Sequence, residues 1–148
     1  MKHLTLSDTA TLAGRLLIAL LFVHEGWIKL THIAASMAYM QNFGLPGWLL
    51  GPALVLELGG GLLLVAGWGS RPVALALAFF CVVAAAIFHR NVVDGNQLLH
   101  FEKDLAIAGG LLAHFAWGPG RLILPAAWLP PGLRGLAGLP AESVKASG

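Results

Sequence analysis

The sequence is poor in charged residues and has almost no cysteine. Only 11% of its 148 residues are Asp, Glu, Lys or Arg, less than half the share of roughly 25% in soluble domains. This scarcity excludes a disordered chain and a conventional soluble enzyme. The net charge of +2 is too small for a nucleic-acid-binding surface. The single cysteine, Cys81, excludes an internal disulfide, a CxxC redox motif and a cysteine-ligated zinc site.

Hydrophobic residues dominate instead, at 57% of the chain, with a mean hydropathy of +0.78. A membrane span needs about 20 mostly apolar residues, and the clearest one, 72–89, has no formal charge. Similar stretches predict spans at 10–30, 48–67 and 97–117. We therefore predict an all-α, polytopic membrane protein built as a bundle of four transmembrane helices. A soluble four-helix bundle would place a charged stripe on every helix, and 72–89 has none.

The remaining segments are too polar or too rich in Pro and Gly to span. Residues 31–47 contain Met and aromatic side chains, which predict a short interfacial helix ended by Gly44 and Pro46. Residues 1–124 are predicted to form the membrane domain. Residues 125–148 are predicted to form a Pro/Gly-rich interfacial segment with a flexible tail. The first span is not expected to be a cleavable signal peptide, because no small-residue cleavage site follows it.

The distribution of Lys and Arg predicts the orientation. With four spans, both termini and the turn at Arg71 share one side of the membrane. Cytoplasmic loops carry the excess of Lys and Arg, so both termini are predicted to be cytoplasmic, in the inner membrane of a prokaryote. The cytoplasmic side then carries Lys2, Arg15, Arg71, Arg121, Arg134 and Lys145, and the other side carries Lys29, Arg90 and Lys103.

Ionisable residues inside the predicted spans are the functional candidates, because each costs about 2.5–3.5 kcal/mol to insert. Glu57 lies near the middle of its span, and Glu25 and Lys29 form an i, i+4 pair. The predicted topology brings six ionisable residues together in the outer third of the bundle, above Glu57. These residues are Glu25, Lys29, His89, His100, Lys103 and Asp104.

Structural explanations exist for each of these residues. Glu25 and Lys29 are then only a stabilising pair, and Lys103 and Asp104 are a helix end reaching water. Glu57 needs a proton, a hydrogen bond or a partner on a neighbouring helix. Three glycines follow it closely, so backbone carbonyls are expected to approach it.

Four segments of the chain resemble the DoxX family of bacterial and archaeal membrane proteins. They are GRLLIALLFVHEGWIKL, NFGLPGWLLGPALVLELGGGLLLVAG, RPVALALAFFCVVAAAIFH and FEKDLAIAGGLLAHFAWGPGRLIL, which together span roughly residues 14–124. The resemblance implies a four-helix protein of the cytoplasmic membrane, and association with quinone-linked or oxidative-stress redox complexes. It points to Arg15, Gly26, Lys29, Glu57, Gly60, His89, Lys103 and Gly110.

Two departures from the family pattern concern charge. The family often has Lys-Asn where this chain has Lys103-Asp104, and Ser-Leu-Asp where this chain continues with Leu122, Ile123 and Leu124. The local charge beside Lys103 therefore differs, and any role of the family's aspartate is missing.

Three functions remain open from the sequence. The first is a membrane subunit of a quinone-linked oxidoreductase, acting with another subunit or as a homo-oligomer, without a metal or flavin motif of its own. In it, the catalytic residues are Glu57, His89 and Lys103, and the quinone-binding residues are Glu25, Lys29, His100 and Asp104. The second is a non-enzymatic scaffold or assembly factor. The third is a small transporter, which the missing inverted repeat disfavours.

Overall fold

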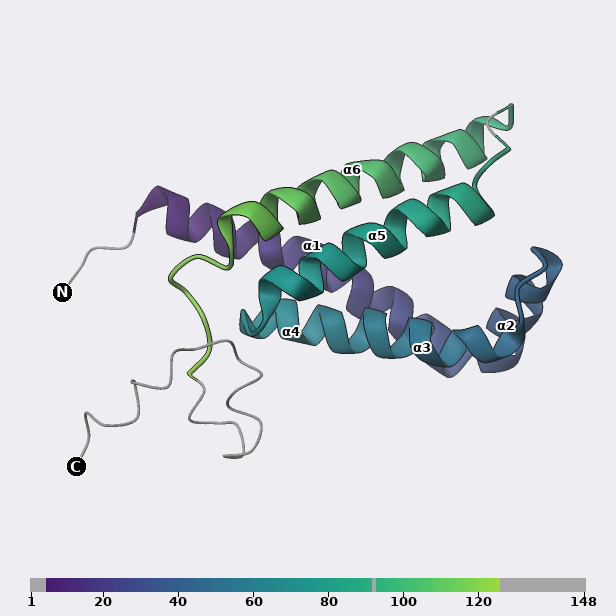
Figure 1. Ribbon diagram of the computed structural model, residues 1–148, viewed down its shortest axis with the longest axis horizontal. Helices are drawn as coiled ribbons and strands as arrows, with labels where there is room; N and C mark the ends of the chain where they lie inside the picture. Colours follow the sequence, from purple (N-terminus) through teal and green to yellow (C-terminus); the bar gives the residue numbers. More distant parts are fainter. Residues whose placement is uncertain (1–4, 92, 126–148) are drawn as a thin grey trace.

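The computed structural model describes residues 5–91 and 93–125, and over these residues the chain is helical without strands. Six α-helices follow one another with two short irregular turns between α2 and α4 (Figure 1). The 3-10 turn η1 covers Gly47–Leu49, and the π-helical turn η2 covers Val55–Gly59. The α-helices are α1 (Leu6–Thr31), α2 (Ile33–Asn42), α3 (Leu50–Leu54), α4 (Gly60–Ala66), α5 (Ser70–Phe88) and α6 (Gly95–Trp117).

Three helical stretches are long and apolar enough to cross a membrane: α1, the stretch Gly47–Ala66, and α5. They match the first three predicted spans within a few residues. A long helix, α6, also occupies the place of the predicted fourth span, but Glu102, Lys103 and Asp104 lie in its first half. Its membrane crossing, and with it the count of four, stays a prediction.

The helices pack as two pairs. Helices α5 and α6 lie antiparallel in close contact along their length, and α1 packs against the second span through α4 and η2 (Figure 1). The two pairs separate toward the end where α2 lies. Aromatic rings connect them there: Tyr39 of α2 lies 5.4 Å from Phe88 of α5, and Phe43 lies 5.1 Å from Phe88, measured between ring centroids.

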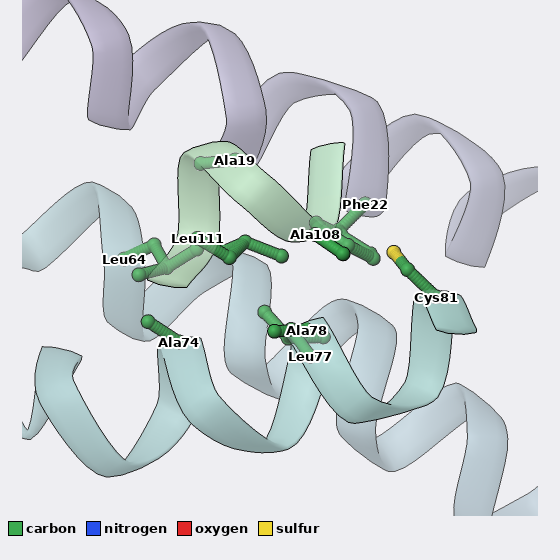
Figure 2. Packing of buried hydrophobic residues seen from close by; sticks show 9 residues of the cluster. All are labelled: Ala19, Phe22, Leu64, Ala74, Leu77, Ala78, Cys81, Ala108 and Leu111. Carbon is green, nitrogen blue, oxygen red and sulfur yellow. The ribbon is translucent and has the colours of Figure 1, made fainter. Parts of the chain in front are cut away.

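Small apolar side chains make up much of the core. Figure 2 shows residues of α1, α4, α5 and α6 meeting in one cluster. Small residues let the helix backbones approach closely, and that contact drives helix association in a bilayer. The cluster contains Ala19, Phe22, Leu64, Ala74, Leu77, Ala78, Cys81, Ala108 and Leu111.

Capping residues explain where the helices begin and end. Helix α1 starts four residues before the predicted boundary, because Thr5 and Asp8 form a capping box that completes its first turn. Helix α2 occupies the predicted segment and is followed by Gly44, whose φ of +77° ends it as expected. Its position at a membrane interface stays a prediction. Of the predicted interfacial segment and tail, only Pro125 lies within the described residues.

Buried Arg15 joins the last described segment to the bundle. Arg15 is 3% exposed. Its Nη1 donates to the Pro119 carbonyl at 2.8 Å, and its Nη2 donates to the Leu122 carbonyl at 2.7 Å. The Leu124 amide then donates to the Ala66 carbonyl at 2.9 Å. The segment after α6 is thus held against the first half of α1 and the end of α4.

Replacing Gly61 with alanine should destabilise the bundle. A Cβ atom there would lie 2.8 Å from Val23 Cγ2 and 3.3 Å from the Ala19 carbonyl oxygen of α1, so the helices must move apart. Overpacking of this kind costs about 1–3 kcal/mol, measured as a lower thermal unfolding midpoint in detergent. Gly109→Ala is the control, since its Cβ meets nothing within 4 Å. Equal losses in both variants would contradict the close contact.

Replacing Arg15 with glutamine should loosen the segment after α6. Carbonyls of Pro119 and Leu122 lose a charged donor, and each such hydrogen bond contributes about 1.5–3 kcal/mol. Hydrogen exchange of residues 118–124 is expected to rise at least tenfold, while exposed Arg90→Gln leaves it unchanged. Unchanged protection in Arg15→Gln would show that other contacts hold the segment.

Candidate functional site

The second span changes its helical winding at Glu57. Residues Val55–Gly59 form a π-helical turn between α3 and α4, and such turns often occur at functional sites. Glu57 lies in the middle of the stretch Gly47–Ala66 and is 3% exposed. The structure therefore places a buried carboxylate halfway along a helix able to cross the membrane.

Lys29 of α1 binds Glu57 across the helix interface. The Lys29 Nζ lies 2.9 Å from Glu57 Oε1, and 3.6 Å from Glu25 Oε2 on its own helix. The i, i+4 pair predicted from the sequence is therefore confirmed, but the shorter contact is the one between helices. Glu25 and Lys29 are partly exposed, whereas the Glu57 side chain is buried. Lys29 donates to the first oxygen of Glu57, and no backbone carbonyl in the described part of the chain is bonded to the carboxyl group.

The second oxygen of Glu57 has no partner. Its Oε2 atom is buried and makes no hydrogen bond within the described part of the chain. A buried acceptor without a partner costs about 1–3 kcal/mol. Two carboxylates also face a single ammonium, which leaves one negative charge if both are ionised. This group can accept a proton or a hydrogen bond from a bound molecule.

A second polar cluster joins the end of α5 to the start of α6. His89 Nδ1 donates to Gln97 Oε1 at 2.8 Å, and its Nε2 lies 3.9 Å from Asp104 Oδ2. The His89 and His100 rings stack at 5.1 Å, and Lys103 Nζ donates to His100 Nδ1 at 3.2 Å. The antiparallel contact of α5 and α6 brings these residues together. Gln97 was not predicted, although it lies one turn before His100 on the same helix.

The two polar clusters are electrostatic neighbours. Glu25 interacts with Glu57 and also with Asp104. The Cys81 thiol is buried in the apolar core cluster. The predicted site residues thus form two separate clusters, one between α1 and the second span and one between the end of α5 and the start of α6. They are Glu25, Lys29, Glu57, His89, His100, Lys103 and Asp104.

Arg15, His32 and an apolar groove lie outside the two polar clusters. Arg15 lies in the first half of α1, away from both polar clusters, and His32 is exposed where α1 ends. Within residues 5–91 and 93–125, no three His, Cys, Asp or Glu side chains lie close enough together to hold a metal ion. An open apolar groove of about 690 Å³ runs between the second span and α5, with Leu56, Gly59 and Ala76 among its lining residues. Its Leu56 immediately precedes Glu57 in the chain.

Replacing Lys29 with methionine should be strongly destabilising, because it leaves the Glu57 carboxylate buried without a cation. Removing one partner of a buried pair costs about 3–5 kcal/mol. The double variant Lys29→Met, Glu57→Gln should recover at least half of this loss, as measured by unfolding in detergent. Glu25→Gln serves as the control and should cost less, since its side chain is 46% exposed. Additive effects of the two single changes would show that the pair is not coupled.

Comparison with known proteins places the chain among membrane proteins. The DoxX family model matches residues 10–90, more than half of the chain. "Inner membrane protein YqjF" of Escherichia coli (strain K12) is 40% identical over 115 residues, which cover 78% of this chain and 88% of the relative. "Inner membrane protein YphA" of the same strain is 29% identical over 120 residues, covering 76% and 86%. No solved structure matches the chain significantly. The resemblance noted in the sequence is therefore confirmed, and the chain belongs to the DoxX family of inner membrane proteins.

Proposed function

We propose that this DoxX-family protein is a membrane subunit of a quinone-linked redox complex. The observation that carries the proposal is the Glu57 carboxylate, which is buried at mid-span. Its Oε1 accepts from Lys29, and its Oε2 has no partner within residues 5–91 and 93–125. This second oxygen of the buried carboxylate can accept a hydrogen bond from a molecule that binds inside the apolar bundle. Ionisable groups at membrane depth usually mark proton or substrate pathways.

The chemistry of a quinone suits the two polar clusters. Its reduction to a quinol takes up two electrons and two protons, so a binding site needs donors for carbonyl oxygens and a supply of protons. Lys29 and His100 supply donors, with Glu25 and Asp104 setting the local charge. Glu57, His89 and Lys103 are the groups we assign to proton transfer. Because Glu25 interacts with both Glu57 and Asp104, the set extends from the α5–α6 turn to mid-span.

The apolar groove provides a surface for the isoprenoid tail of a quinone. Ligand sites are typically apolar walls with a few placed polar groups. Val55, Leu56 and Gly59 of the π-helical turn line this groove, although Glu57 itself does not. We propose that the tail lies there, beside the turn that carries Glu57.

Electrons are proposed to come from a partner subunit. The chain has one cysteine and no sequence motif for haem, flavin or an iron–sulfur cluster. We further propose that α6 completes a four-helix, multi-pass bundle with both termini in the cytoplasm. In that topology the polar clusters lie in the outer half of the membrane.

A scaffold or assembly function is the alternative, and one observation favours it. Most of the polar side chains bind one another, as in the Lys29–Glu57 and His89–Gln97 contacts. Contacts of this kind lock helices together without any ligand. In that case Glu57→Gln and His89→Ala alter stability or recovery of the complex, and leave redox turnover unchanged.

Quinone binding by the purified protein in nanodiscs tests the proposed function. We expect saturable binding of ubiquinone or menaquinone, weakened at least tenfold by Glu57→Gln, because the substitution removes the charged acceptor. Glu102→Gln is the matched control, since Glu102 is exposed on α6. Absence of saturable binding in the wild-type protein, or equal affinity in both variants, would reject the quinone site.

A further inference from the structure

Helix α1 has a polar residue on the face that points away from the bundle. The buried face of α1 is formed by Asp8, Arg15, Ala19, Phe22 and Gly26. His24 follows Phe22 by two residues, about 200° around the helix, and is exposed. Its imidazole makes no hydrogen bond or ion pair with the part of the chain that the structure describes.

His24 lies too deep for water if α1 crosses the bilayer. It is about five residues, or roughly 8 Å, from the middle of Leu6–Thr31, inside a hydrocarbon half-thickness of about 15 Å. Histidines at such depth almost always face a protein interior or a water-filled cavity. A lipid tail offers the imidazole neither a donor nor an acceptor.

The residues around His24 form a seam suited to another helix. The exposed residues Ala10, Ala13, Leu17, Leu20, His24 and Trp27 are separated alternately by three and four residues. This is the spacing at which one helix packs along another in a left-handed crossing. A shallow apolar hollow of about 350 Å³, lined by Leu17, Leu20, Leu21 and His24, lies on the seam. Small Ala10 and Ala13 at one end permit close approach.

We propose that this seam is the contact between two copies of the chain, with His24 meeting His24 across a two-fold axis. In a symmetric dimer the same residue from each copy meets at the axis. A neutral imidazole has one donor and one acceptor nitrogen, so one His24 can donate to the other. A second copy therefore supplies both the apolar seam and the polar partner that lipid lacks.

The dimer goes beyond the proposed function and does not depend on it. Lys29 follows Phe22 by two helical turns and lies on the buried face of α1, so pairing through His24 leaves the Lys29–Glu57 contact inside each copy. Failure of quinone binding would leave the dimer standing, and failure of the dimer would leave the polar site standing.

Disulfide cross-linking in native membranes tests the contact. Leu17→Cys and His24→Cys, each in a Cys81→Ala background, are expected to give a covalent dimer of twice the chain mass after mild oxidation. Phe79→Cys is the matched control, because Phe79 is 70% exposed on α5 and lies off the seam. No dimer from either seam position, equal yield at Phe79, or a cross-link only to a different protein would each overturn the proposal.

Substitution of His24 tests the hydrogen bond itself. His24→Leu should weaken dimerisation about three- to tenfold in nanodiscs or detergent, the size of one interhelical hydrogen bond in a membrane. His24→Gln should retain the dimer, because an amide is also both donor and acceptor. Phe79→Leu controls for altered apolar surface. A His24→Leu protein as dimeric as the wild type, by light scattering, would overturn the role of the imidazole.

Discussion

The contact between Lys29 and Glu57 constrains the rest of the structure. It joins the first span to the middle of the second at 2.9 Å, where the Glu57 side chain is 4% exposed. A carboxylate at this depth costs several kcal/mol without a cation. The contact therefore requires that α1 lie close to η2, and glycines permit it. A Cβ on Gly26 would fall 2.7 Å from Leu58 Cγ.

The two faces of helix α1 differ in their surroundings. Its buried face carries Arg15 toward the segment after α6 and Lys29 toward Glu57, so one helix organises both ends of the bundle. Its opposite face is exposed and presents His24. Arg15 thus has a packing role toward the segment after α6, and Lys29 belongs to the polar site with Glu57.

The helices could be predicted from the sequence because each depends on the residues within it and at its two ends. Apolar runs bounded by charges, Gly or Pro predict the helices, and the boundaries fall within a few residues. The missed start of α1 came from the Thr5–Asp8 capping box, which precedes the apolar run that defined the predicted span. The π-helical turn had no clear signal, although Glu57 followed by three glycines is the residue pattern at which it occurs.

The sequence by itself determined the class of protein, the helices and the short list of polar residues, because scarcity of charge in apolar runs has one physical explanation, a lipid solvent. Family membership also follows from the sequence alone. Only the tertiary structure decided the partners. It assigned Lys29 to Glu57 and Gln97 to His89, and left Glu57 Oε2 and His24 without a partner among the residues that the structure describes. These pairings join residues on different helices, whose relative rotation is fixed by packing of small residues throughout the bundle and not by any local spacing.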